Sequence, residues 1–179
     1  MRMIGLAALS AAALGLAACD NNNKPETGAP LPDGAHATAM LRTATGADAG
    51  RATVTEVAGG LRVTLDARNL PPGTHGAHLH TTGRCDAPDF ASAGPHWNPT
   101  GRKHGAMNPQ GPHTGDLPNL IIGSDGRGTV GAMLPGASMA ALLDADGGAM
   151  VVHAGADDLM TDPSGNSGGR IACGPLQST

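Results

Sequence analysis

The chain has 179 residues, with 28 glycines and 14 prolines but only one tryptophan, one phenylalanine and no tyrosine. So few large apolar side chains exclude a large helical bundle and a membrane protein with many spans. They allow one small domain with a thin core that needs help from cross-links or metals. The formal net charge of −4 argues against a nucleic-acid partner, which favours a basic surface.

The N-terminus has the pattern of an export signal. A short positive start precedes an apolar run over residues 4–18, which is too short for a comfortable transmembrane helix. The run leads into Leu16-Ala17-Ala18-Cys19, and small residues before a cysteine resemble the bacterial lipobox, where the peptide is cut before a cysteine that is then acylated. An ordinary signal peptide that happens to contain a cysteine is the alternative. We expect residues 1–18 to be a lipoprotein signal peptide and Cys19 to carry the lipid, which anchors the domain on the periplasmic side of the bacterial cell envelope.

Residues 19–35 show no periodicity and many turn formers, so we expect a flexible tether ahead of a folded domain over residues 36–179. With Cys19 acylated, Cys85 and Cys173 remain. Two cysteines in an exported chain indicate one disulfide, and two free thiols are the alternative. A disulfide that closes so long a loop stabilises the fold by about 4–5 kcal/mol in the chain-entropy model.

Short strand patterns follow one another along the domain. Alternation is loose over 36–45 and clear over 61–68, and Gly59-Gly60 joins the latter run to a β-branched run at 52–57, which predicts a hairpin. A second hairpin is predicted where Ser124-Asp125-Gly126-Arg127 separates two further apolar runs. From residue 78 onward the strand candidates are short apolar runs. They cover residues 78–80, 117–122, 129–134, 150–152 and 170–172.

These patterns predict an all-β fold, a sandwich or flattened barrel of about eight antiparallel strands. Helical periodicity is scarce, and residues 138–143 make a turn at most. Two stretches, 81–116 and 155–169, carry no strand pattern. Loops of that length are normally functional or disordered.

Histidine is the residue that indicates function. Seven of the eight histidines lie between residues 75 and 153. His78 and His80 are two apart on a strand-like run, so both imidazoles point to one face of a sheet and form a natural pair of metal ligands. A single histidine is more often a hydrogen-bonded or surface residue than a ligand, but that interpretation has to explain six histidines and one aspartate together. Imidazole ligands suit zinc, copper, iron and nickel, and the set exceeds one four-coordinate site, so two neighbouring metals are expected. The set comprises His78, His80, His96, His104, His113, Asp116 and His153.

An ordered series of motifs from about His36 to Cys173 resembles the copper/zinc superoxide dismutase family. The motifs are Gly73-Thr74-His75-Gly76-Ala77-His78-Leu79-His80, Ala93-Gly94-Pro95-His96-Trp97-Asn98-Pro99, Arg102-Lys103-His104-Gly105, His113-Thr114-Gly115-Asp116-Leu117, Val151-Val152-His153, Ala156-Asp157-Asp158-Leu159 and Gly165-Asn166-Ser167-Gly168-Gly169-Arg170-Ile171-Ala172-Cys173-Gly174. The family fold is a Greek-key β-sandwich, in agreement with the strand count.

The resemblance implies one copper and one zinc per subunit. It implies that His78, His80, His96 and His153 hold copper, and that His96, His104, His113 and Asp116 hold zinc. His96 bridges the two metals. Asp157 is implied as the carboxylate that joins a copper histidine to a zinc histidine, and Cys85 is implied to bond Cys173. His75 matches a structural position of the family, and His36 matches none.

The implied activity is dismutation of superoxide to O₂ and hydrogen peroxide by a redox-cycling copper beside a structural zinc, protecting the cell envelope. The catalytic residues implied are His96, which carries a proton, and Arg170, a permanent cation beside copper for the superoxide anion. A copper buffer or a sandwich with decayed sites would lack a copper ligand or Arg170, and both features are present. The loop 155–169 is short and carries few charges, so electrostatic guidance is weak or assigned elsewhere. The sequence leaves open whether the chain forms a homodimer.

Overall fold

The computed structural model describes residues 34–179, and they form ten strands, one turn of α-helix and one short 3₁₀ helix, η1. The expected signal peptide, Cys19 and nearly all of the expected tether lie outside the described residues. The strands are β1 (His36–Thr43), β2 (Asp48–Val57), β3 (Gly60–Ala67), β4 (Gly73–His75), β5 (Ala77–His80), β6 (Leu120–Ile122), β7 (Gly128–Pro135), β8 (Ala149–His153), β9 (Arg170–Pro175) and β10 (Gln177–Ser178). This confirms the all-β prediction, with two very short strands beyond the number expected.

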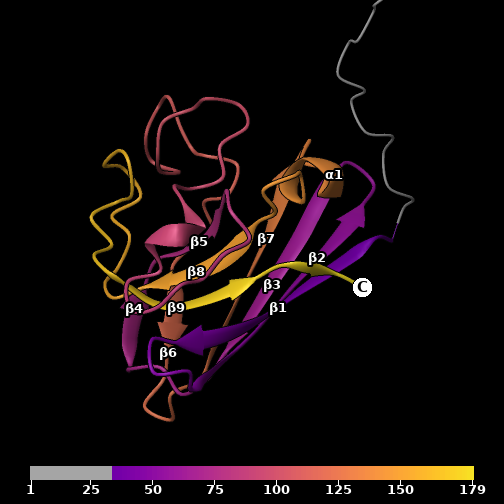
Figure 1. Cartoon of the computed structure of the whole chain (residues 1–179). Helices are drawn as coiled ribbons and strands as arrows, with labels where there is room; N and C mark the ends of the chain where they lie inside the picture. The colour runs from indigo at the N-terminus through magenta and orange to yellow at the C-terminus, as the bar shows by residue number, and fades with distance from the viewer. Residues whose placement is uncertain (1–33) are drawn as a thin grey trace, which may run out of the picture.

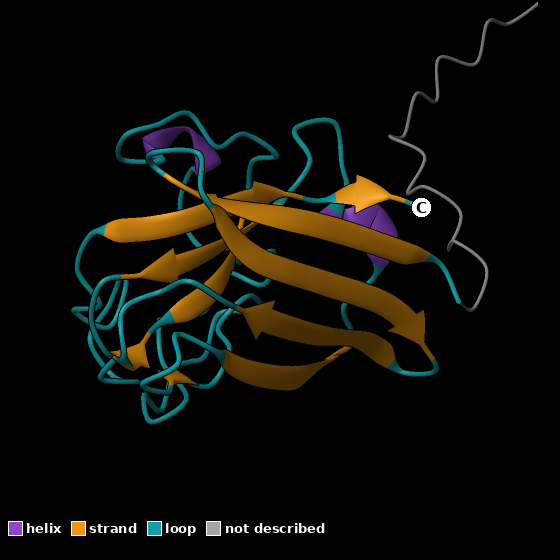
Figure 2. Ribbon diagram, turned by 90° about the horizontal axis from the view of Figure 1, so that it is seen from below, coloured by secondary structure: helices purple, strands orange, loops and turns teal. Residues whose placement is uncertain are grey.

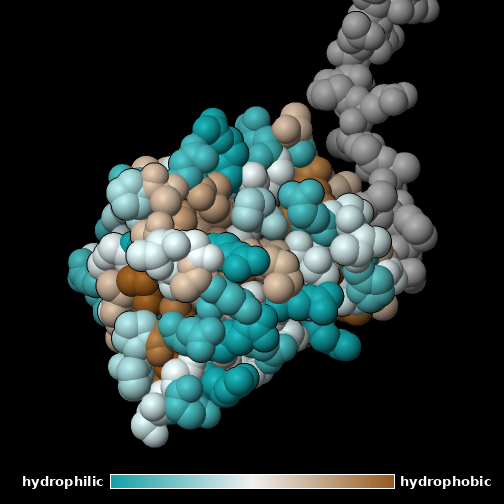
Figure 3. Space-filling view, turned by 60° about the horizontal axis from the view of Figure 1, so that its bottom comes forward, coloured by the Kyte–Doolittle hydropathy of each residue, from teal (hydrophilic) through white to brown (hydrophobic). Residues whose placement is uncertain are grey.

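The main sheet is antiparallel and runs in the order β5-β8-β9-β1-β2-β3-β7, with β10 paired to β1 and a separate pair formed by β4 and β6 (Figure 1). Alternation places Ala37, Ala39 and Leu41 of β1 and Leu61, Val63 and Leu65 of β3 in the core. The long strands cross the molecule, and most loops gather away from the C-terminus (Figure 2). The surface seen in Figure 3 is mainly hydrophilic, with hydrophobic residues in small separate spots.

The first predicted hairpin is confirmed, and the second is wrong in its strand pairing. β2 and β3 pair from Gly50↔Ala67 to Val57↔Gly60, and Gly59 takes the left-handed φ of +86° at the turn. The second turn also forms, with the Gly123 N–H donating to Arg127 O at 2.8 Å. The two strands that flank this turn do not pair with each other. β6, before it, pairs with β4, and β7, after it, pairs with β3 over its whole length. A local turn signal cannot identify such distant partners.

The two stretches without strand pattern are long loops, as predicted. Residues 81–116 contain only the short η1 helix (Ala91–Ala93) and isolated bridges, and residues 155–169 contain no strand. The two loops lie together at one end of the molecule, where the Met107 N–H donates to Leu159 O at 2.8 Å (Figure 1). This end of the molecule holds the six histidines expected to be metal ligands.

A disulfide between Cys85 and Cys173 ties the first of these loops to β9, across a sequence separation of 88 residues. Cys173 belongs to a small second core cluster with Phe90 and Val151, and Cys85 packs against that cluster. The predicted cross-link is therefore confirmed.

The helix α1 (Met139–Leu142) is a single turn, capped by Ser138 Oγ, which accepts from the Ala141 N–H at 3.3 Å. Within residues 34–179, no helix has the length and apolar character needed to cross a membrane.

Candidate metal centre

Four imidazoles meet where the main sheet ends against the long loop 81–116. β5 contributes His78 and His80, and its register with β8 places His153 at the end of the neighbouring strand. His96 reaches them from the loop, which forms an isolated bridge with His80. One ring nitrogen from each of the four lies within 4.8 Å of the others. We call His78, His80, His96 and His153 the four-imidazole cluster.

Each ring of this cluster has one buried nitrogen that finds no hydrogen-bond partner among residues 34–179: Nδ1 of His78 and Nε2 of His80, His96 and His153. Buried polar atoms are normally hydrogen-bonded, so four such atoms in one place indicate a missing partner. A metal ion satisfies nitrogen lone pairs in this arrangement.

The other nitrogen of three of these rings is held by the protein. His78 Nε2 donates to Asp157 Oδ2 at 2.7 Å, and His80 Nδ1 donates to Gly94 O at 2.8 Å. His153 Nδ1 donates to Gly168 O at 3.2 Å. Metal-binding imidazoles typically donate their outer N–H in this way, because the bond fixes both the ring and its tautomer.

Burial keeps these rings neutral, which is the form that binds metal. It lowers the pKa of His78 to about 4, although the hydrogen bond to Asp157 acts in the opposite direction. It also lowers the pKa of His153 to about 3 and that of His80 to about 2. At neutral pH all three lone pairs are therefore available.

Asp116 is the centre of a second cluster. Its carboxylate lies 2.9 Å from His96 Nδ1, 3.0 Å from His104 Nδ1 and 3.3 Å from His113 Nδ1. Burial raises the pKa of Asp116, but the hydrogen bonds from His96 and from the Gly105 N–H outweigh it and lower that pKa well below its usual range. Three imidazole nitrogens and one carboxylate can hold a tetrahedral zinc ion. We call His96, His104, His113 and Asp116 the carboxylate cluster.

Ligand atoms of His78, His96, His104 and Asp116 also lie within 4.8 Å of one another. His78 has its Nε2 bound to Asp157, so its single free nitrogen already belongs to the four-imidazole cluster. His113 brings a free Nδ1 next to Asp116. The free nitrogens therefore favour His113, and not His78, as the third imidazole of the carboxylate cluster.

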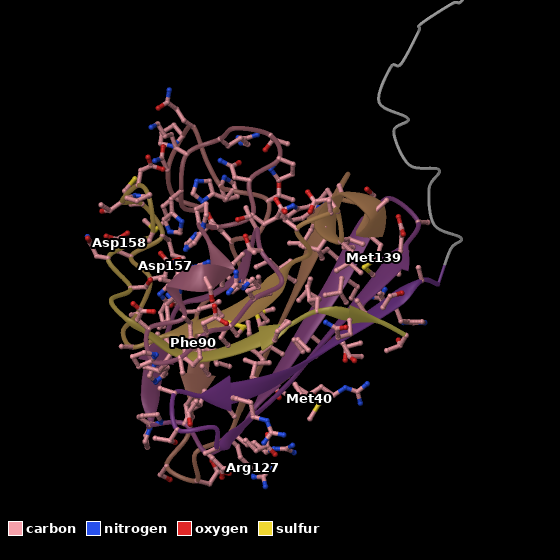
Figure 4. The ribbon with its side chains drawn as sticks, viewed as in Figure 1. Met40, Phe90, Arg127, Met139, Asp157 and Asp158 are labelled. Atoms are coloured by element: carbon pink, nitrogen blue, oxygen red, sulfur yellow. A yellow bond between two sulfur atoms is a disulfide. The ribbon has the colours of Figure 1, made fainter. Side chains whose placement is uncertain are left out.

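The two clusters are joined twice. His96 faces Asp116 with Nδ1 and the four-imidazole cluster with Nε2. Asp157, at the start of the loop 155–169 (Figure 4), accepts from His78 with Oδ2 and from His104 Nε2 with Oδ1 at 2.9 Å. Burial raises the pKa of Asp157, but these two hydrogen bonds outweigh it and lower the pKa, which keeps the carboxylate ionised.

Arg170 begins β9 beside His153, with which it is paired in the sheet. Its guanidinium donates to Phe90 O at 2.6 Å and to Gly94 O at 2.7 Å. The second of these oxygens is also the acceptor for His80. The cation is therefore fixed next to the four-imidazole cluster and half-buried there.

Comparison with known proteins agrees with this geometry. A family model described as copper/zinc superoxide dismutase matches residues 48–176. The chain belongs to the copper/zinc superoxide dismutase family. A superoxide dismutase [Cu-Zn] of Caulobacter vibrioides is 43% identical over 148 residues, which cover 79% of this chain and 85% of that protein. One of Deinococcus radiodurans is 35% identical and covers 99% of this chain and 98% of its own.

Solved structures of the family have the same fold. A SOD-like protein from Bacillus subtilis superposes with a TM-score of 0.73 at 41% identity, covering 78% of this chain and 97% of its own. Cu/Zn superoxide dismutase from Brucella abortus gives 0.64 at 29% identity, covering 79% and 99%. The Greek-key sandwich, the superoxide dismutase activity and the use of copper and zinc follow for this chain.

The remaining two histidines lie outside both clusters. His75 is buried and bonds His153 O at 2.8 Å and Pro71 O at 2.9 Å, as a structural residue does. His36 is exposed, and its ring contacts Thr55 Oγ1 at 3.0 Å.

Sequence reasoning missed Asn119, which clamps the backbone of Asp157. Its amide donates to Asp157 O and accepts from the Asp157 N–H, both at 2.8 Å. A lone asparagine before a short apolar run gives no signal of this contact, because its partner lies 38 residues away.

Proposed function

We propose that copper binds at the four-imidazole cluster, zinc binds at the carboxylate cluster, and His96 is shared between them. The observation that carries this assignment is the set of six buried imidazole nitrogens that lack a hydrogen-bond partner in the described part of the chain. They belong to the six histidines of the two clusters, and His75, which is equally buried, has both nitrogens bonded. The free nitrogens therefore mark ligands and not buried histidines in general.

Copper supplies the one-electron chemistry of dismutation, in which one superoxide is oxidised to O₂ and a second is reduced to peroxide. The chain supplies the proton and the guidance. His96 Nε2 faces the four-imidazole cluster without a partner among residues 34–179, so this atom can take up a proton and return it while Nδ1 stays in the carboxylate cluster. Arg170 attracts the anion, which matters because the net charge of −4 repels it overall.

Replacing Arg170 with Ala tests the mechanism. We expect superoxide dismutation to fall about tenfold or more, the lower end of what electrostatic focusing supplies, because no ligand is removed while the anion loses its cation. Copper content should stay near that of the wild type. The wild-type rate should drop with added salt, since ions screen the attraction over about 10 Å at 0.1 M, and the variant should respond less.

Arg127→Ala is the matched control for this experiment. Arg127 lies in an exposed turn at the far end of the molecule from Asp157 (Figure 4), so its removal changes the net charge equally without touching the site. A full rate and an unchanged salt response in Arg170→Ala would contradict the assigned role. Loss of copper would show instead that Arg170 serves to hold the loop.

The proposal extends to location: the enzyme is a lipoprotein, anchored through Cys19 on the periplasmic side of the envelope, which it protects from superoxide. The small residues before Cys19 support this, and so does the disulfide between Cys85 and Cys173, since disulfides persist in oxidising compartments.

Cys19→Ser in the full chain should release the protein from the membrane fraction while its activity per folded molecule stays unchanged. Acyl chains contribute about 0.8 kcal/mol for each buried CH₂, and the substitution removes the atom that would carry them. Fractionation with an immunoblot measures the shift, and Cys19→Ala serves as a second variant. A Cys19→Ser protein that stays firmly with membranes would refute the lipid anchor.

A further inference from the structure

His113 differs from the other histidines of the two clusters in the contact of its outer nitrogen. The outer nitrogens of His78 and His104 bond Asp157, and those of His80 and His153 bond backbone carbonyls. No hydrogen bond to Nε2 of His113 is present in the described residues. The nearest carboxylate oxygen to it is Asp162 Oδ1, at 3.8 Å.

Asp162 comes from the other long loop and is already held in place. Its Oδ1 accepts from the backbone N–H of His104 at 2.8 Å, and its Oδ2 accepts from Lys103 Nζ at 3.1 Å. Like any aspartate it is ionised at neutral pH, and its side chain is about one-third exposed. The carboxylate is thus a negative charge that its two contacts hold in one position.

We propose that Asp162 is a positioning residue for the zinc site, which acts on His104 through the backbone and on His113 through the ring. The proposal rests on the assignment of zinc to the carboxylate cluster. A carboxylate facing Nε2 favours the tautomer that carries its proton on Nε2, and this leaves Nδ1 unprotonated beside Asp116. At 3.8 Å the pair is longer than a hydrogen bond. A small ring rotation or one bridging water would complete the contact.

This role differs from that of the neighbouring Asp158. Asp158 accepts from the N–H groups of Met160 and Thr161 and from the Asn166 amide, all within its own loop. Asp162 crosses instead to the loop 81–116. Asp158 therefore orders its own loop, whereas Asp162 attaches that loop to the segment that carries His104.

The test measures zinc affinity of the full chain by competition with a chelator. We expect Asp162→Ala to bind zinc about 10- to 100-fold more weakly, the loss typical for an outer-shell partner of a metal ligand, with copper affinity close to the wild type. Asp162→Glu should recover part of the loss. With cobalt(II) in the zinc site, the visible bands of Asp162→Ala should shift, because the position of His113 changes.

Two further variants separate this role from general loop stability. Lys103→Met removes only the exposed ion pair, and we expect its zinc affinity to stay within about twofold, since such pairs contribute little. Asp158→Ala loosens the loop alone and should leave the cobalt bands in place. Wild-type zinc affinity in Asp162→Ala, or an equal loss in Lys103→Met, would overturn the proposal. A His113→Ala protein that binds zinc like the wild type would instead refute the zinc assignment beneath it.

Discussion

His153→Ala should lose copper and with it nearly all superoxide dismutase activity, while zinc remains bound. His153 is buried at the end of β8 and offers a free Nε2 to the four-imidazole cluster. It is not one of the groups around the Asp116 carboxylate. Removal of one of the four proposed copper ligands should cost more than the 10- to 100-fold loss typical of an outer-shell partner, so we expect the activity to fall by more than about 100-fold.

Metal analysis together with an activity assay measures this result. His36→Ala is the matched control, because its ring is exposed and bonds Thr55, away from both clusters, and it should keep both metals and full activity. A His153→Ala protein with wild-type copper content would show that the copper ligands are assigned wrongly. Parallel loss of zinc would show that the two sites do not bind independently.

The metal-free protein should lose stability steeply as the pH falls below about 6.5. In the folded chain the pKa of His78 is lowered to about 4, that of His153 to about 3 and that of His80 to about 2, from an ordinary value of 6.5. Below pH 6.5 the unfolded chain therefore binds protons at these histidines, while the folded chain keeps them neutral. The free energy of unfolding is highest above pH 6.5 and declines toward pH 4 and below. At about 1.4 kcal/mol per pKa unit, His78 alone accounts for about 3 kcal/mol.

Thermal unfolding of metal-free protein between pH 7 and pH 4 measures this decline. Metal-free His153→Ala should show a shallower decline, since one of the three groups is gone, and His36→Ala should follow the wild type. With metals bound, the loss should begin at lower pH, because protons must then displace the ions from the same nitrogens. A melting temperature of the metal-free protein that is flat from pH 7 to pH 5 would contradict the argument.

Local features of the fold could be predicted from the sequence, and distant partners could not. The alternation of β3 and the glycines before it are enough to predict its pairing with β2, because both signals lie within one hairpin. Nothing in the residues of β6 indicates that it pairs with β4 and not with β7. That choice depends on how the chain crosses between sheets.

The same distinction applies to the site. Imidazoles are scarce in most chains, so seven of them between residues 75 and 153 point to metal chemistry even before the fold is known. Asn119 and Asp162 gave no such signal, since asparagine and aspartate in loops usually serve turns. Their contacts appear only when the loop 155–169 lies beside the loop 81–116, for Asp162, and beside the start of β6, for Asn119.

One backbone oxygen fixes the position of the Arg170 guanidinium relative to a ring of the four-imidazole cluster. Gly94 O accepts from both Arg170 and His80, so the distance between the attracting cation and this imidazole depends on a peptide group and not on two independent rotamers. Gly94 holds the left-handed φ of +74°, and a Cβ there would crowd the hydroxyls of Thr81 and Thr82. A position with no side chain thus helps to determine where the cation of Arg170 stands beside the four-imidazole cluster.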